Sequence, residues 1–135
     1  MKKYEILEHK ADLKIRAFGG TKEELFSNIL FGMAESQRPK IKIKEKTRRE
    51  IKIKSLDLST LLVDFLSEAL YLSQVNKEVY FDAKFKKFSD REIEGELFGQ
   101  KIERFDEDIK AATYHGLNIH RREGKTWEAT VLFDI

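Results

Sequence analysis

Apolar residues recur every three to four positions in two segments of the chain, the spacing that favours amphipathic helices. In the first segment Thr21 and Glu24 have the spacing of a capping box, in which the two side chains satisfy the first free amide groups. This pattern predicts a helix over residues 22–36. Its apolar positions are Leu25, Phe26, Ile29, Leu30, Met33 and Ala34.

The second helical segment begins after Asp57 or Ser59, either of which is a suitable N-cap. The sequence LLVDFLSEALYLS then supplies a broad apolar stripe. Its members are Leu58, Leu61, Leu62, Phe65, Leu66, Ala69 and Leu70. Both stripes are typical of surfaces that pack on a sheet.

Elsewhere the period is two, which is typical of half-buried strands. Strands are predicted in EVYFDAKF, REIEGELFGQ, KAATYHGLNIH and TWEATVLFDI, and in the alternating run that begins at Leu13. The turn sequence Arg-Arg-Glu-Gly joins the last two strands as a hairpin. We therefore expect an α+β fold in which two α-helices pack on one face of a mostly antiparallel or mixed sheet.

The length and composition restrict the class of protein. A chain of 135 residues without a Pro/Gly/Ser-rich linker is expected to form a single domain over residues 1–135. The sequence contains no cysteine, which excludes disulfides, thiol nucleophiles and cysteine-ligated metals. It also lacks a signal-peptide pattern and any apolar run of membrane-spanning length, so we expect a cytoplasmic protein.

The formal net charge is only +2, but residues 38–54 carry nine Lys and Arg against two Glu. Alternating Ile and Lys predict two strands or one bent ribbon there, with isoleucines inward and lysines outward. One interpretation is a solvated strand face whose lysines protect a sheet edge. The other is an RNA-binding surface, although the stretch has no aromatic residue that could stack on bases.

Familiar catalytic motifs are absent from the sequence: it has no P-loop, GxGxxG, HExxH or nucleophile elbow. Its three histidines are His9, His115 and His120. The last two lie five positions apart on one predicted strand, so we expect them to point to opposite faces. These features do not favour independent catalysis.

Two carboxylates stand out. Asp12 interrupts the entry to a strand, and Asp134 interrupts an otherwise apolar strand just before Ile135. If these strands are neighbours, both side chains and the main-chain carboxylate of Ile135 could form an all-oxygen site for calcium, magnesium or manganese. The alternative is that the aspartates are local turn caps.

Three separated motifs resemble the archease family. They are HKAD followed by IRAFGGTKEELF, then DIKAATYHGL, and finally WEATVLFDI, in the family's order. One departure is Lys10, where the family commonly has threonine. The resemblance extends across nearly the whole chain.

The resemblance implies an accessory protein of the RtcB-type RNA ligase that joins tRNA exon halves, rather than an enzyme. Archeases promote guanylylation and multiple turnover of the ligase and broaden its use of nucleotides, and they touch tRNA only through the ligase. The family's metal ligands carry over to Asp12, Asp134 and Ile135, with Ca²⁺ expected in isolation and Mg²⁺ or Mn²⁺ as alternatives. Lys110 is the matching lysine near this site. His9 and His115 are candidates for the partner surface.

Two other functions remain open from the residues. An RNA-binding or RNA-chaperone module would use the basic stretch 38–54, and would bind RNA without a ligase. A small metal-dependent phosphohydrolase would use the two carboxylates, although no clear base accompanies them.

Overall fold

The computed structural model describes residues 2–7 and 11–135, apart from the side chains of residues 43 and 44. The predicted partner residue His9 and the atypical Lys10 lie outside these ranges. In chain order the described elements are β1 (Tyr4–Leu7), β2 (Leu13–Gly19), α1 (Lys22–Ser36), β3 (Pro39–Lys54), α2 (Leu58–Asn76), β4 (Glu78–Phe88), β5 (Glu92–Phe105), β6 (Ala111–Arg121) and β7 (Trp127–Asp134).

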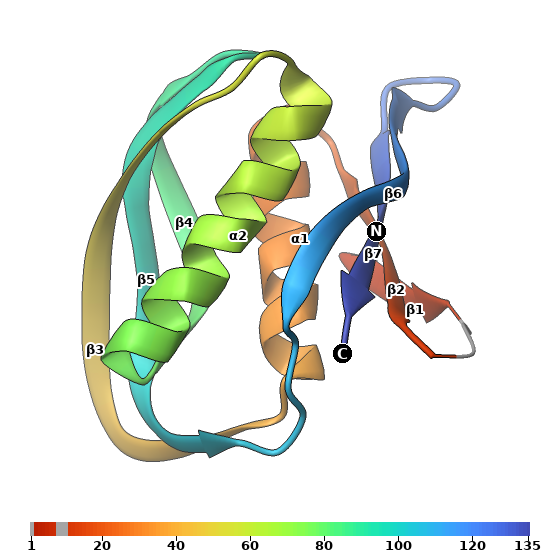
Figure 1. Ribbon diagram of the computed structural model, residues 1–135. Coiled ribbons are helices and arrows are strands. Elements are labelled where there is room, and N and C mark those ends of the chain that lie inside the picture. Colours follow the sequence, from red (N-terminus) through yellow and green to blue (C-terminus); the bar gives the residue numbers. More distant parts are fainter. Residues whose placement is uncertain (1, 8–10) are drawn as a thin grey trace.

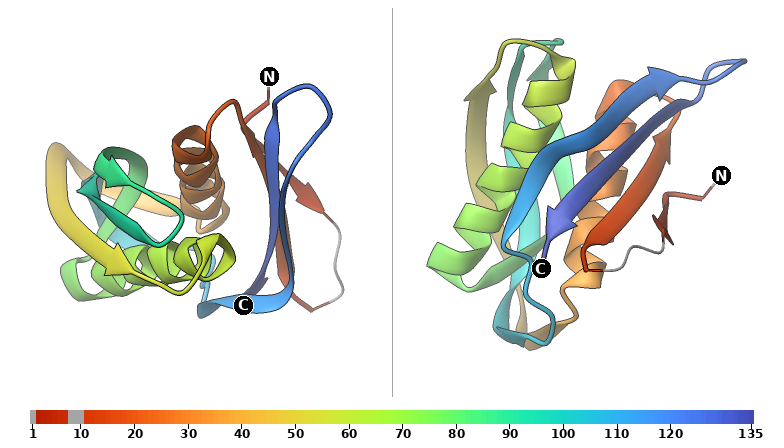
Figure 2. Two further views of the ribbon diagram at one scale, coloured as in Figure 1. Left: turned by 90° about the horizontal axis from the view of Figure 1, so that it is seen from above. Right: turned by 45° about the vertical axis from the view of Figure 1, so that its right-hand side comes forward.

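The strands form two antiparallel sheets, with the two helices between them (Figures 1 and 2). One sheet has four strands in the order β1-β2-β7-β6, and the other has three in the order β3-β5-β4. The expected α+β class and antiparallel pairing are confirmed. The two helices lie on one face of each sheet and contact strands of both, whereas the sequence predicted a single sheet.

The width of the apolar stripes explains this three-layer arrangement. A helix with one covered side needs one apolar face, whereas a helix between two sheets needs a wider one. In α2 the adjacent residues Leu61, Leu62 and Val63 are all buried, so they cover more than one side of the helix. The sheets contribute residues such as Ile15 and Phe133 to the same core.

Both helices begin where the sequence predicts. The side chain of Thr21 accepts a hydrogen bond from the amide of Glu24 at 3.0 Å, and the Glu24 carboxylate accepts one from the amide of Gly20 at 3.3 Å. The first helix has the predicted bounds. Of the two candidate caps for α2 the structure uses Asp57, whose carboxylate accepts from the amide of Thr60 at 2.8 Å.

The predicted basic ribbon is one long edge strand, β3, with an irregular register between Ile41 and Lys46. Ile51 and Ile53 are buried, whereas Lys52 and Lys54 are exposed. The expected inward isoleucines and outward lysines are therefore confirmed for this half of the strand.

The three-stranded sheet curves through irregular pairing between β4 and β5, with register shifts after Tyr80 and after Phe85. Gly99 of β5 permits one of these close approaches, because a Cβ atom at this position would overlap the carbonyl oxygen of Val79.

A buried carboxylate lies at the start of β4. Glu78 is fully buried and accepts two hydrogen bonds from Arg49, at 2.9 and 2.8 Å. It also accepts one from the Tyr80 hydroxyl at 2.7 Å and lies 3.2 Å from the ammonium of Lys101. These groups connect β3, β4 and β5 at one end of the three-stranded sheet.

None of the helices in the described ranges is both long and apolar enough to cross a membrane.

Candidate functional site

The pairing of β2 with β7 brings the two singled-out aspartates to the same end of the four-stranded sheet. Leu13 pairs with Phe133 in an antiparallel register. Continuing that register by one residue places Asp12, directly before β2, opposite Asp134 at the end of β7. Asp12 is half-buried and Asp134 is exposed. The condition set by the sequence, that these two strands are neighbours, is fulfilled.

The start of β6 lies on the other side of Asp134. The amide of Lys110 donates a hydrogen bond to the main-chain oxygen of Asp134 at 2.8 Å, and Ala111 pairs with Asp134. The Lys110 side chain is exposed. Figure 2 shows the end of the chain beside the starts of β2 and β6. The backbone thus places Asp12, Asp134 and Lys110 on three adjacent strand ends.

Carboxylate oxygens dominate the donor atoms at this end. In the part of the chain that the structure describes, no group of three or more histidine, cysteine, aspartate and glutamate side chains is placed to hold a metal ion. A cation bound here therefore needs a ligand besides Asp12 and Asp134. The sequence analysis predicts that Ile135, directly after Asp134, supplies this ligand.

His115 lies farther along β6, where the strand is irregular. The register with β7 shifts between Thr113 and Asn118, and Gly116 has a positive φ of 63° that favours glycine. His115 is exposed, and its amide donates to the Thr113 hydroxyl at 3.3 Å. The register does not bring His115 to the two aspartates. The regular alternation that we used to place His115 and His120 on opposite faces is interrupted here.

A hydrogen-bonded link that sequence reasoning missed connects this irregular segment to α2. The Tyr114 hydroxyl donates to one oxygen of Asp64 at 2.9 Å, and the Ser55 hydroxyl donates to the other at 2.6 Å. Burial, together with the hydrogen bond to the Asp64 carboxylate, raises the pKa of Tyr114 above its ordinary value of 10.0. A signal was present, because Asp64 is the one charged residue in the apolar run LLVDFL.

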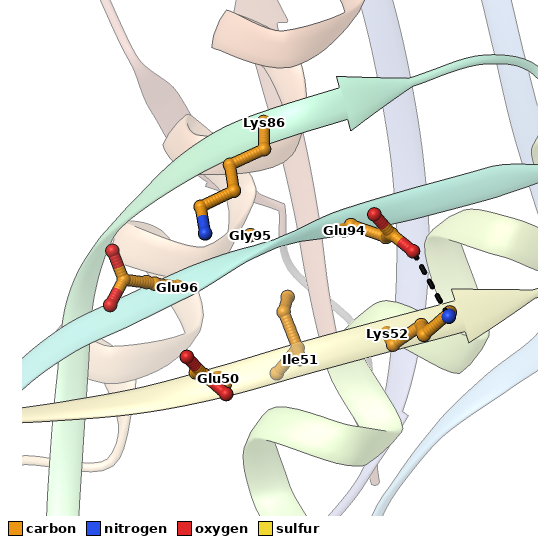
Figure 3. A pocket seen from close by; sticks show the side chains of 7 residues that line it. All are labelled: Glu50, Ile51, Lys52, Lys86, Glu94, Gly95 and Glu96. Atoms are coloured by element: carbon orange, nitrogen blue, oxygen red, sulfur yellow. Dashed lines mark ion pairs between the residues drawn. The ribbon is translucent and has the colours of Figure 1, made fainter.

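The basic strand β3 faces carboxylates of β5. Lys52 forms the ion pair with Glu94 that is drawn in Figure 3, at 3.2 Å, and Lys54 lies 3.3 Å from Glu92. Arg48 is paired in the same way with a β5 glutamate at 3.1 Å. These ion pairs offset much of the positive charge of the stretch, so the surface is less suited to nucleic-acid phosphates than the sequence suggested.

The fold and the site together define a small α+β protein with carboxylates gathered at one end of a sheet. The model of the Archease protein family matches residues 4–135, and the chain belongs to this family. It is 38% identical to the archease of Methanosarcina mazei, over 99% of this chain and 97% of the relative. It is 34% identical to the archease of Pyrococcus furiosus, over the full length of both.

Solved structures agree with this assignment. The solution structure of protein 1598 from Methanobacterium thermoautotrophicum superimposes with a TM-score of 0.71 and 27% identity, over the whole of both chains. The crystal structure of an archease from Thermotoga maritima, described as a possible chaperone, has a TM-score of 0.66. It shares 20% identity over 96% of this chain and 94% of its own, so it supports the fold alone. The family expected from the sequence motifs is confirmed.

Proposed function

We propose that this protein is a non-catalytic activator of an RtcB-type tRNA-splicing RNA ligase. In this role it promotes guanylylation and multiple turnover of the ligase and broadens its use of nucleotides. We further propose that Asp12, Asp134 and the carboxylate of Ile135 hold a divalent cation. The observation that carries the proposal is the β2–β7 register, which extends to place Asp12 opposite Asp134 in a chain that belongs to the archease family.

The donor set fits a hard divalent cation. Two adjacent carboxylates repel each other unless a proton or a cation lies between them, and a third carboxylate increases that repulsion. Ca²⁺ takes six to eight oxygen ligands with flexible geometry, and Mg²⁺ and Mn²⁺ also prefer oxygen. Asp134 is exposed, so water has access to complete the coordination. We expect Ca²⁺ in the isolated protein, with Mg²⁺ or Mn²⁺ as alternatives.

The pairing of the strands holds the backbone of the site residues in place. The hydrogen bond from the Lys110 amide fixes the backbone of Asp134 against β6, while β2 fixes the residue next to Asp12. In this proposal Lys110 supplies a positive charge near the carboxylates; in the structure the residue lines a hollow with Tyr71 and Gln74 of α2. A divalent ion, when bound, neutralises charge on phosphate oxygens and aligns them. Guanylylation of the ligase releases pyrophosphate from GTP, so a cation presented by a docked activator suits that chemistry.

A second version of the proposal needs no contact between the ion and the nucleotide. Here the activator shifts the ligase towards its nucleotide-binding conformation, and the ion only orders the activator. Stripping the metal from the activator separates the two versions. Full activation by metal-free protein would exclude direct participation of the ion.

The experiment measures GTP-dependent guanylylation and multiple-turnover ligation by a matched RtcB-type ligase, with and without this protein. We expect stimulation by the wild type and little or none by Asp12→Asn or Asp134→Asn. Asp90→Asn is a matched control, because Asp90 forms an ion pair at 2.6 Å with Lys22, the first residue of α1, and is not part of the proposed ion site. Circular dichroism establishes that each variant is folded. Absence of stimulation by folded wild-type protein would overturn the proposal.

Calorimetric titration with Ca²⁺ and Mn²⁺ tests the ion site independently of the ligase. The wild type and Asp90→Asn should bind the ion, and both site variants should lose it. Ion binding that survives in Asp12→Asn and Asp134→Asn would show that these carboxylates are local caps.

A further inference from the structure

A groove with a volume of about 360 Å³ lies at the C-terminal end of α1, next to Ile135. Tyr4 and Ile6 of β1 form part of its wall, together with Leu13 at the start of β2. Ile109, which is buried, closes another part of the groove. The groove therefore has an apolar lining that comes from segments far apart in the sequence.

Two aliphatic side chains of this groove are unusually open to solvent. Ile6 and Ile135 each expose 51% of their surface. Single exposed apolar residues are common on proteins, and Leu56 and Val75 are examples in this chain. Ile6 and Ile135 differ from these because they line one concave surface, and concave apolar surfaces are typical of binding sites.

The groove has a negatively charged rim. Glu35 and Glu107 line it, against one positive charge from Arg38. The C-terminal end of α1 also lies here and carries the partial negative charge of the helix dipole. The Tyr4 hydroxyl donates to the Glu35 carboxylate at 2.7 Å and holds it at the rim.

We propose that this groove docks a segment of the partner protein that inserts an aliphatic or aromatic side chain and carries a lysine or arginine beside it. The apolar wall accommodates the inserted side chain, and the acidic rim selects the adjacent cation. The proposal rests on the proposed function, since the partner is then the RNA ligase. It adds to that function a docking surface that is distinct from the proposed ion site.

The position of Ile135 connects the two surfaces. Its side chain lines the groove, while its carboxylate belongs to the proposed ion site. A partner segment seated in the groove therefore lies directly beside the ion. Docking in the groove would therefore bring the partner's reacting groups to the ion. Contacts with the rest of the activator's surface would not be needed for this.

The test compares the affinity of variants for the purified ligase by isothermal titration calorimetry. Ile6→Ser and Ile135→Ser each remove an exposed apolar side chain from the groove, and each should weaken binding about tenfold. Val75→Ser removes an exposed apolar residue from α2 and should bind as the wild type does. Glu107→Lys should also weaken binding, whereas Glu123→Lys, in the exposed β6–β7 turn, should not.

Titration with Ca²⁺ tests whether a groove variant keeps the proposed ion site, and sedimentation measures self-association of the protein. Ile6→Ser should retain the wild-type affinity for Ca²⁺, because Ile6 lies outside the proposed ion site, while Asp134→Asn should lose it. Circular dichroism and thermal melting establish that the variants are folded.

The outcomes separate the two proposals. If wild-type protein binds the ligase and folded Ile6→Ser and Ile135→Ser bind equally well, the groove proposal is overturned and the proposed function stands. If folded wild-type protein neither binds nor stimulates the ligase, the proposed function is overturned, and the groove proposal with it. Self-association of the wild type that Ile6→Ser abolishes would assign the groove to a second copy of the chain, and would also overturn the proposal.

Discussion

Replacing Glu78 by glutamine tests the buried ion cluster that joins the three strands β3, β5 and β4. The carboxylate of Glu78 has no exposed surface, whereas its partners Arg49 and Lys101 remain about two-fifths exposed, at 38% and 39%. Glutamine keeps the size of the side chain but removes its charge. Removing one partner of a buried pair costs about 3–5 kcal/mol. Because the two cations can turn towards water, we expect a loss of unfolding free energy of about 3 kcal/mol.

The pH dependence gives an independent value for the stabilisation that the Glu78 carboxylate contributes. The Arg49 guanidinium lowers the pKa of Glu78 from the ordinary 4.5 to about 2. A depressed carboxyl pKa stabilises the fold above the unfolded-state value and loses this contribution as the pH falls towards the folded-state value. The two pKa values correspond to about 3 kcal/mol of stabilisation at neutral pH, of which about 2 kcal/mol is lost by pH 3.

The assay is urea unfolding followed by circular dichroism at pH 7, 5 and 3. The difference in unfolding free energy between wild type and Glu78→Gln should shrink by about 2 kcal/mol between pH 7 and pH 3. Glu103→Gln is the control, because Glu103 forms an exposed pair with Lys40 at 3.5 Å and should change stability by less than about 1 kcal/mol. An equal loss of stability with pH in wild type and Glu78→Gln would refute the reasoning.

Two further substitutions test the local geometry. Gly99→Ala should destabilise the protein by about 3 kcal/mol, because the new methyl group would overlap the carbonyl oxygen of Val79; Gly20→Ala, whose Cβ would lie 3.8 Å from its nearest neighbour, should be nearly neutral in the same urea titration. Thr21→Ala removes the hydrogen bond to the amide of Glu24 and should cost about 1 kcal/mol by thermal unfolding, while Thr21→Ser should retain most of the stability. Wild-type stability of Gly99→Ala, or equal losses in the two Thr21 variants, would contradict these assignments.

The helices were predictable from the sequence because their determinants are local. The 3.6-residue period and the Thr21–Glu24 box lie within the segment that they specify, and helix α1 has the predicted bounds. The division of the strands into two sheets was not predicted, because an alternating pattern shows which side of a strand is buried but not which strand is its neighbour. That choice depends on contacts between residues far apart in the chain.

The candidate site was predictable only in part. The unusual positions of Asp12 and Asp134 were visible in the sequence, but their proximity depends on the pairing of β2 with β7. The irregular register at His115 could not be read from an alternating pattern. The link from Tyr114 to Asp64 was also missed, because a single aspartate in an apolar helix segment does not identify its partner. The family assignment came from the three sequence motifs, and the family match confirms it.

The place of β7 between β2 and β6 sets the order in which the protein can be completed during synthesis. The three-stranded sheet and both helices belong to residues that leave the ribosome before β7 does. The four-stranded sheet lacks an interior strand until Trp127–Asp134 has been released, so the paired strands β1 and β2 cannot be joined to β6 before then. Asp12 therefore faces Asp134 only in the last stage of folding. A nascent chain stalled before β7 would carry the helices without the proposed ion site.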